Sequence, residues 1–381
     1  MRLSLLRLFR AIFVGFIICG FVEVGIAGRS TIMRKAPYLI YPGNNTRMEV
    51  LWQLDSTYTC IIRWGTDTTY SLGNQMITEY GNSHQYEYSI TDLMPGAKYY
   101  YKVEVEGCSK SGSFVAAPPD SASCLKFMAY GDSRSHPARH NKVASAIVAT
   151  FAKDPAYQTF ILSNGDLVND GDEESEWDEQ LFDPKYRSIQ IELADIQFIS
   201  AIGNHEENGL LFEKYFPYPF VENRYWSFDY GPAHFALIDQ YVDYDENSAQ
   251  LQWLADDLAS SDKPWKFLCL HQPGWSAGNH ENDKIVQKYI QPLCVQYGVA
   301  IVFAGHNHYY ARAVVDGVQH ITTGGGGAPL YSPDPEKANI VAAKKSYHFC
   351  RMEINGDQLH FTARTSANAV IDSFSMRLPG H

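Results

Sequence analysis

Cysteine is sparse in this chain, and none of its seven cysteines stands in a CxxC pair. A thiolate zinc site of the usual spacing therefore has no support. Basic residues are also few, since 31 Lys and Arg stand against 43 Asp and Glu, for a net charge of −12. This balance argues against nonspecific nucleic-acid binding, which needs a basic face.

Long apolar runs are absent after the first residues, so no later segment predicts a membrane span. At the start of the chain, a positively charged stretch precedes the apolar run Ala11–Gly20, and small residues follow up to Ala27. This pattern predicts a signal peptide over residues 1–27 and a secreted or periplasmic protein without stable membrane insertion. An uncleaved anchor is the alternative, although Glu23 interrupts the run and the run is short for a span.

Residues 34–117 are predicted to form strands only. Aromatic and β-branched residues alternate in part and are separated by turns of Gly, Asn, Asp and Pro. The clearest strands are Met48–Trp52, Thr59–Trp64, Gln85–Ile90 and Lys98–Val105. About seven short strands over such a length are typical of a small β-sandwich. The turn Leu93–Gly96, followed by Tyr99–Tyr101, resembles fibronectin type III modules, so we expect an all-β, fibronectin type III-like N-terminal sandwich. A disulfide between Cys60 and Cys108 is left open, because sequence alone cannot fix connectivity.

Residues 123–370 alternate strands with helical patterns and are predicted to form an α/β domain. A linker rich in Ala and Pro, Ala116–Asp120, precedes them. Helices are predicted over Asn141–Phe151 and Ser248–Ala259, with Ser248 as the N-cap of the second. The chain is therefore expected to contain two domains.

Polar side chains follow five apolar runs of this second domain, at the point where each run ends. The runs end at Gly131-Asp132, Gly165-Asp166, Gly203-Asn204-His205, His271 and Gly305-His306-Asn307-His308. In α/β layers, ligands bind beyond the carboxyl ends of the strands, so five such ends can meet at one site. A single Gly-Asp pair is common in turns, but five strand ends each followed by Asp, Asn or His indicate a shared site.

These residue types suit a two-metal centre that hydrolyses phosphate esters. Two metal ions about 3.5–4 Å apart neutralise the anionic substrate and lower the pKa of a bound water to about 7. Such a centre needs one bridging carboxylate, with imidazole and oxygen ligands for the rest. We expect Asp166 to bridge, Asp132 and His308 to complete the first metal site, and Asn204, His271 and His306 to complete the second. His205 would face the substrate and transfer a proton.

In order and rough spacing, the five blocks resemble those of the calcineurin-like metallophosphoesterase superfamily. The preceding sandwich resembles the N-terminal domain of purple acid phosphatases. The resemblance implies a four-layer α/β/β/α sandwich, two metals and phosphomonoesterase activity. It assigns the same metal ligands and gives the proton transfer to His205.

Two positions depart from that pattern. Asn169 stands where purple acid phosphatases have a tyrosine, so no tyrosinate-to-iron colour is expected, and Asn169 would ligate directly or through water. Arg134 stands where many other superfamily members have a histidine. We expect its guanidinium to face the phosphate, with a salt bridge to the acidic stretch 170–176 as the alternative. The first metal would then lack its usual fourth protein ligand, which leaves a one-metal or inactive protein open.

The sequence thus predicts a secreted, metal-dependent phosphoesterase that hydrolyses small phosphate monoesters. Fe, Zn and Mn all suit its oxygen and imidazole ligands, so the metal identities stay open. One alternative is a phosphodiesterase or nucleotidase with the same site. Another is a non-catalytic binding protein with a vestigial metal site.

Overall fold

The structure, a computed structural model, describes residues 32–79 and 83–378. The predicted signal peptide, residues 1–27, lies outside these two ranges. None of the helices within them is long and apolar enough to cross a membrane. All six cysteines in the described ranges are free, so Cys60 and Cys108 form no disulfide here.

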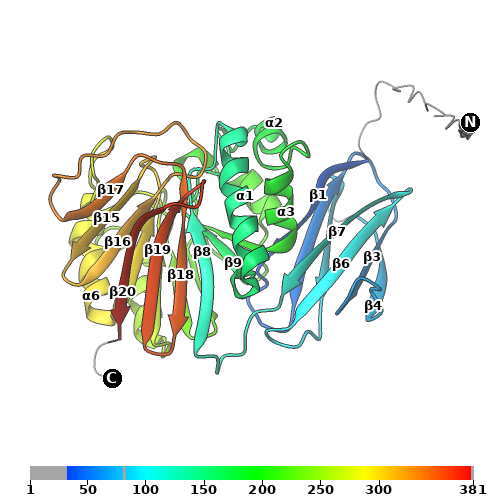
Figure 1. Ribbon diagram of the computed structural model, residues 1–381, viewed down its shortest axis with the longest axis horizontal. Helices are drawn as coiled ribbons and strands as arrows, with labels where there is room; N and C mark the ends of the chain where they lie inside the picture. Colours follow the sequence, from blue (N-terminus) through cyan, green and yellow to red (C-terminus); the bar gives the residue numbers. More distant parts are fainter. Residues whose placement is uncertain (1–31, 80–82, 379–381) are drawn as a thin grey trace, which may run out of the picture. The chain divides into compact units, whose positions relative to one another are not determined.

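The first seven strands form a β-sandwich (Figure 1). One of its layers contains β1 (Met33–Ile40), β2 (Met48–Leu54) and β5 (Gln85–Ile90). The other contains β4 (Gly73–Ile77), β3 (Cys60–Gly65), β6 (Lys98–Val105) and β7 (Cys108–Val115). Trp52, Tyr86 and Tyr101 are fully buried in the core of this sandwich. The predicted all-β N-terminal sandwich is confirmed.

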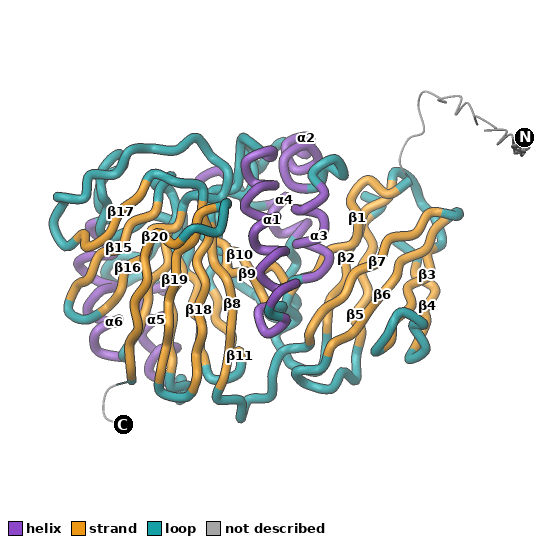
Figure 2. The backbone as a smooth tube through the Cα atoms, in the orientation of Figure 1, coloured by secondary structure: helices purple, strands orange, loops and turns teal. Residues whose placement is uncertain are grey.

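The rest of the chain forms two further β-layers, with helices on their outer faces (Figure 2). The first layer consists of β8 (Cys124–Tyr130), β9 (Phe160–Ser163), β10 (Gln197–Ser200), β18 (His348–Asn355), β19 (Gln358–Thr365) and β20 (Val370–Arg377). The second consists of β11 (Trp226–Tyr230), β12 (Ala233–Leu237), β13 (Trp265–Cys269), β14 (Val299–Ala304), β15 (Tyr310–Val315), β16 (Val318–Thr323) and β17 (Ile340–Lys344). This is the predicted α/β domain.

Helices cover both layers, and the predicted cap and apolar face explain where one of them forms. The helices are α1 (Pro137–Lys153), α2 (Glu174–Glu176), α3 (Arg187–Asp195), α4 (Leu210–Tyr215), α5 (Ala249–Ser260) and α6 (Gln291–Tyr297). Ser248 caps α5, since its Oγ accepts from the backbone N–H of Leu251 at 3.1 Å. Leu254 and Leu258 are buried against the second layer.

The parallel strands bring their carboxyl ends level with one another. In the first layer, Tyr130 lies opposite Ser163, and Ser163 lies opposite Ser200. In the second layer, Cys269 lies opposite Phe303. These strands are buried on both faces, which is why their sequences are continuous apolar runs rather than alternating ones. The loops that follow the strands carry the predicted site residues.

Strand β1 joins the sandwich to the α/β domain, because it pairs in parallel with β10 and so completes a nine-stranded sheet. Ile40 lies opposite Phe198 in this pairing. Hydrogen bonds fasten the same junction: the Tyr101 hydroxyl donates to the Ala194 carbonyl at 2.9 Å, and Asp195 accepts from the backbone N–H of Ser113 at 2.7 Å. The predicted domain boundaries, 34–117 and 123–370, stay a prediction.

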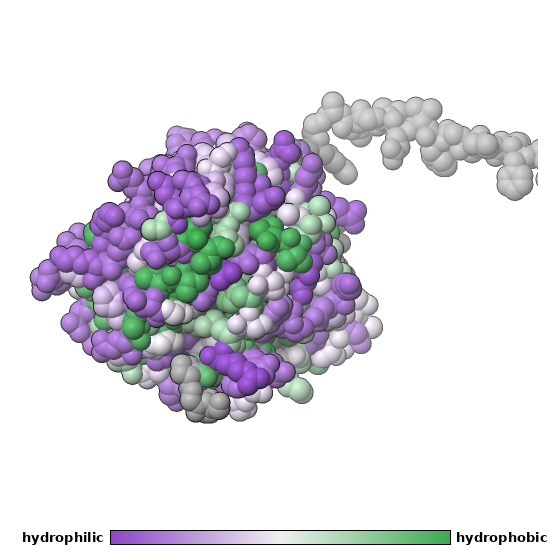
Figure 3. All heavy atoms as spheres, turned by 60° about the vertical axis from the view of Figure 1, so that its left-hand side comes forward, coloured by the Kyte–Doolittle hydropathy of each residue, from purple (hydrophilic) through white to green (hydrophobic). Residues whose placement is uncertain are grey.

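The strand at the far edge of this sheet, β20, runs to Arg377 and pairs only with β19 among the described strands. Val370 on it is 57 % exposed. On the face drawn in Figure 3, apolar side chains stand in small groups between hydrophilic ones. Polar residues that alternate along an edge strand make it a poor template for pairing with another chain.

His234 in β12 is held between two carboxylates. Its Nδ1 lies 2.8 Å from Asp229 Oδ1 and its Nε2 lies 2.8 Å from Asp257 Oδ2, which links the β11–β12 hairpin to α5. Burial opposes the charged imidazolium, but the two hydrogen-bonded carboxylates outweigh burial and raise the pKa of His234 to about 9.

Replacing His234 by Gln (His234→Gln) should lower the free energy of unfolding by about 1–3 kcal/mol near pH 6. A raised pKa stabilises the fold fully below the unfolded value and loses this effect as the pH rises through about 9. Urea unfolding at about pH 6 and about pH 10 measures the difference. The control is His360→Gln, which replaces an exposed histidine hydrogen-bonded to Ser375. Equal destabilisation at both pH values would contradict the assignment.

Candidate metal centre

Three residues at the strand ends have left-handed backbone conformations, with φ of 56° at Asp132, 58° at Asp166 and 65° at His306. Non-glycine residues rarely adopt this region, and each instance costs about 1–3 kcal/mol. The conformation turns the chain sharply as each strand ends. The loop after β10 also comes close to Asp166, since a Cβ on Gly203 would overlap with Asp166 Oδ1. The same crowding explains why glycine is needed at that position.

Four predicted ligands converge on one point, which we call the second position: Asp166, Asn204, His271 and His306. Asn204 Oδ1 lies 3.2 Å from His271 Nε2 and 3.0 Å from His306 Nδ1. His271 Nε2 lies 3.3 Å from Asp166 Oδ1. Ligand atoms of one metal with bonds of about 2.0–2.2 Å lie roughly 2.9–3.6 Å apart. The second position therefore fits a metal ion.

Hydrogen bonds on the far side of two histidine rings fix which nitrogen is available as a ligand. His271 Nδ1 lies 2.7 Å from the Asn164 carbonyl, and His308 Nδ1 lies 2.8 Å from the Pro329 carbonyl. A carbonyl can only accept, so Nδ1 carries the proton in both rings. The Nε2 atoms therefore point into the centre, as in many metal sites with oriented histidines.

The electrostatics of the second position are those of a site built for a cation. Burial opposes the charge of Asp166, but His271, His205 and Arg134 outweigh burial and hold the pKa of Asp166 well below its usual value. Burial likewise opposes a charged His271, but Asp166 and Asp132 raise the pKa of His271 to about 9. Burial and the neighbouring His271 lower the pKa of His306 to about 3.

Glu206, which the sequence analysis did not single out, ties two of the loops together. Its Oε1 accepts from the backbone N–H of Leu167 at 2.7 Å, and its Oε2 accepts from those of Asp166 at 2.8 Å and Gly203 at 2.6 Å. The side chain is fully buried, and burial with the charge of Asp166 raises its pKa to about 7. The only feature of the sequence that could have indicated a role for Glu206 is its position directly after Asn204 and His205.

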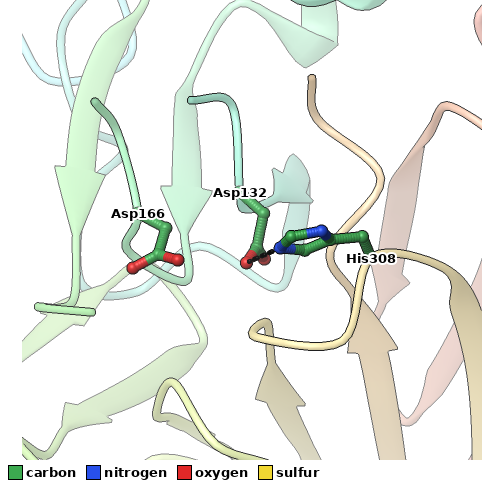
Figure 4. A group of neighbouring side chains, drawn as sticks. All are labelled: Asp132, Asp166 and His308. Atoms are coloured by element: carbon green, nitrogen blue, oxygen red, sulfur yellow. Dashed lines mark ion pairs between the residues drawn. The ribbon is translucent and has the colours of Figure 1, made fainter. Parts of the chain in front are cut away.

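Asp132, Asp166 and His308 form a second group, which we call the first position (Figure 4). Their ligand atoms lie within 4.8 Å of one another, and Asp132 Oδ1 is 3.5 Å from His308 Nε2. Asp132 also accepts from the backbone N–H of His306 at 2.9 Å, which joins this group to the second position. Six of the seven predicted Asp, Asn and His ligands, all except Asn169, therefore lie in these two groups.

Arg134 extends into the first position. Its Nε lies 3.0 Å from Asp166 Oδ2 and its Nη2 lies 3.3 Å from His308 Nε2. Its ion pair is thus with Asp166, and not with the acidic stretch 170–176 considered from the sequence. Asn169 Oδ1 accepts from Arg134 Nη1 at 3.3 Å and from the Ser135 hydroxyl at 2.9 Å. Whether Asn169 also ligates a metal stays a prediction.

His205 stands at the edge of the centre, and its side chain is 23 % exposed. Its backbone N–H donates to Asp166 Oδ1 at 3.0 Å, and its Nδ1 lies 2.6 Å from the carbonyl of Asn169. Because the carbonyl must accept, Nδ1 carries a proton and Nε2 is the ring atom free for proton transfer.

Aromatic rings lie against two of the ligands. The His280 ring centroid is 4.1 Å from that of His306, and Tyr331 stacks on His308 at 4.3 Å. Tyr331 lies in a loop with no motif, so sequence patterns gave no signal for it. These two rings therefore pack directly on predicted metal ligands.

Comparisons with known proteins concern the family and the fold. Residues 126–310 match the family model described as Calcineurin-like phosphoesterase. Purple acid phosphatase 23 of Arabidopsis thaliana is 35 % identical over 127 residues, which are 29 % of this chain and 28 % of that protein. Probable inactive purple acid phosphatase 27 of the same plant is 26 % identical over 354 residues, covering 76 % of this chain and 57 % of that protein. The match thus spans less than two thirds of each relative.

Among solved structures, a purple acid phosphatase from yellow lupin (Lupinus luteus) seeds superposes with a TM-score of 0.75 and 20 % identity. The superposition covers 90 % of this chain and 74 % of that one. At this identity the likeness concerns the fold, and it includes the sandwich as well as the α/β domain.

The variant Glu206→Gln should destabilise the centre, because an amide has one acceptor oxygen and cannot serve three backbone N–H groups. Leaving at least one buried N–H unpaired should cost about 1–3 kcal/mol of unfolding free energy. Urea unfolding measures this cost, with Glu207→Gln, at an exposed neighbour, as the control. Wild-type stability in Glu206→Gln would show that the carboxylate does not hold the loops.

Proposed function

Residues 126–310 match the model of the calcineurin-like phosphoesterase family, and from this match we propose that the protein is a metal-dependent phosphatase that hydrolyses phosphate monoesters. The observation that carries the proposal is the second position. There Asp166, Asn204, His271 and His306 direct an oxygen or nitrogen atom to one point, with 3.0–3.3 Å between neighbouring atoms.

When bound, Fe, Zn or Mn ions supply positive charge against the anionic phosphorus centre and activate a water molecule. The chain's own residues prepare the rest. His205 keeps its Nδ1 proton on the Asn169 carbonyl and offers Nε2 to the leaving oxygen of the substrate. The proposed enzyme works best at mildly acidic pH, as an acid phosphatase does.

Three further features complete the proposal. The predicted signal peptide over residues 1–27 makes the enzyme a secreted or periplasmic phosphatase. Asn169 stands where related purple enzymes have a tyrosine, so the proposed enzyme is colourless with iron. Its substrate is a small phosphate ester, since the net charge of −12 disfavours nucleic acid.

The full chain should hydrolyse p-nitrophenyl phosphate in preference to bis-p-nitrophenyl phosphate, and a chelator should abolish both activities. The variant Asp166→Ala should lose turnover and metal at the second position, because it removes a shared ligand and its charge. Asp256→Ala, on the exposed face of α5, is the control. Preference for the diester would indicate a phosphodiesterase, and no chelator-sensitive turnover would favour a non-catalytic protein.

His205→Ala should lower kcat by about 10²–10⁴-fold while metal content stays at the wild-type level. The loss should be larger for an alkyl phosphate than for p-nitrophenyl phosphate, since p-nitrophenolate leaves without a proton. Steady-state kinetics with both substrates and elemental analysis of the same samples test this. Metal loss, or an equal effect on both substrates, would reject proton transfer by His205.

A further inference from the structure

The family model that residues 126–310 match implies two metals, but the first position already contains a cationic group. The Arg134 guanidinium donates through Nε to Asp166 Oδ2 at 3.0 Å and approaches His308 Nε2 with Nη2 at 3.3 Å. Its side chain is only 13 % exposed, so the charge lies inside the centre and not at its rim. Both contacted atoms are predicted ligands of the first metal.

The contact with His308 excludes a metal on the same atom. His308 Nδ1 carries the ring proton, because it donates to the Pro329 carbonyl at 2.8 Å. The Nε2 atom therefore has a single lone pair, and arginine can only donate. That lone pair accepts the hydrogen bond from Arg134 Nη2 at 3.3 Å. A metal at the first position could not use His308 while Arg134 is in place.

Neighbouring side chains hold Arg134 in this orientation. Its Nη1 donates to the Ser135 hydroxyl at 3.2 Å and to Asn169 Oδ1 at 3.3 Å. Gln180 Oε1 accepts from the backbone N–H groups of Ser135 at 2.7 Å and Asn169 at 3.1 Å, and so fixes both acceptors. Described residues thus supply acceptors for four of the five guanidinium N–H groups. The fifth, on Nη2, remains for the substrate.

The charge balance of the centre also suits one metal. Asp132 and Asp166 carry two negative charges, and Arg134 supplies one fixed positive charge beside them. With the buried Glu206 carboxylate beside Asp166 counted as well, one divalent ion at the second position and the guanidinium balance the three acidic groups. A further divalent ion at the first position would lie next to the guanidinium, and the two like charges would repel each other in a buried site.

We propose that Arg134 replaces the first metal of the pair, so that the protein holds a single metal ion at the second position. The inference rests on the proposed function for its role in catalysis, where the guanidinium would stand for the missing cation beside the phosphate. The metal content that it predicts is independent of catalysis.

The test counts metal ions with Mn²⁺ as the probe. Chelator-treated full-length protein is titrated with Mn²⁺ by calorimetry, and bound Mn²⁺ is measured by elemental analysis after desalting. Wild-type protein should bind about one Mn²⁺ per chain and show the electron paramagnetic resonance signal of an isolated ion. Arg134→Ala should bind about two and show the signal of a spin-coupled pair, because His308 Nε2 is released.

Two other variants support the comparison. Arg134→His removes the guanidinium and adds an imidazole, so it should also bind about two Mn²⁺ per chain. Arg139→Ala, which removes a guanidinium that lies over Tyr347 outside the centre, should stay at about one. Circular dichroism checks that each variant is folded. Two tightly bound Mn²⁺ per wild-type chain would overturn the inference without reference to any variant, and so would a folded Arg134→Ala that stays at one.

Phosphatase assays on the same samples separate this inference from the proposed function. One Mn²⁺ per chain without hydrolysis of p-nitrophenyl phosphate would reject the function and retain the replacement of the metal by Arg134. Two Mn²⁺ per wild-type chain with hydrolysis would retain the function and reject the replacement.

Discussion

Asp166 has to remain ionised in a place that water hardly reaches, and the surrounding centre meets that requirement. Its side chain is only 1 % exposed, and an isolated buried carboxylate would be protonated rather than charged. The backbone N–H of His205 and the guanidinium of Arg134 both donate to it, at 3.0 Å each. Glu206 in turn fixes the peptide of Asp166 itself. One charge therefore dictates the arrangement of the loops that follow β9 and β10.

The two departures from the family pattern turn out to be physically connected. Arg134 and Asn169 lie far apart in the sequence, yet Nη1 of one is 3.3 Å from Oδ1 of the other. An amide oxygen can accept from a guanidinium, whereas an ionised tyrosine beside a metal would compete with it for the same space. The two departures then belong together: Arg134 takes the place of a metal ion, and Asn169 takes the place of a metal ligand and accepts a hydrogen bond from Arg134.

Sequence patterns predicted the strands and the meeting of the ligands, because both follow from local rules. Apolar runs that end in Asp, Asn or His mark strand ends, and parallel strands bring those ends to one edge. The direction of Arg134 was beyond such rules, since its long side chain could reach the phosphate, an acidic loop or the centre itself. Contacts with Asp166, Asn169 and His308, all distant in the chain, decide between these directions. The pairing of β1 with β10 could not be predicted either, because the residue pattern of a strand does not indicate which strand it pairs with.

The pairing of β1 with β10 lets the sandwich support the part of the molecule that carries the candidate metal centre. Strand β10 ends at Ser200, and the chain reaches Asn204 only a few residues later. Without β1, one edge of β10 would lose its parallel neighbour and its backbone groups would need water or another strand. In a shortened chain that begins at the α/β domain, β10 would therefore have an unpaired edge next to the loop that carries Asn204. The sandwich, through β1, therefore supports the strand from which that loop starts.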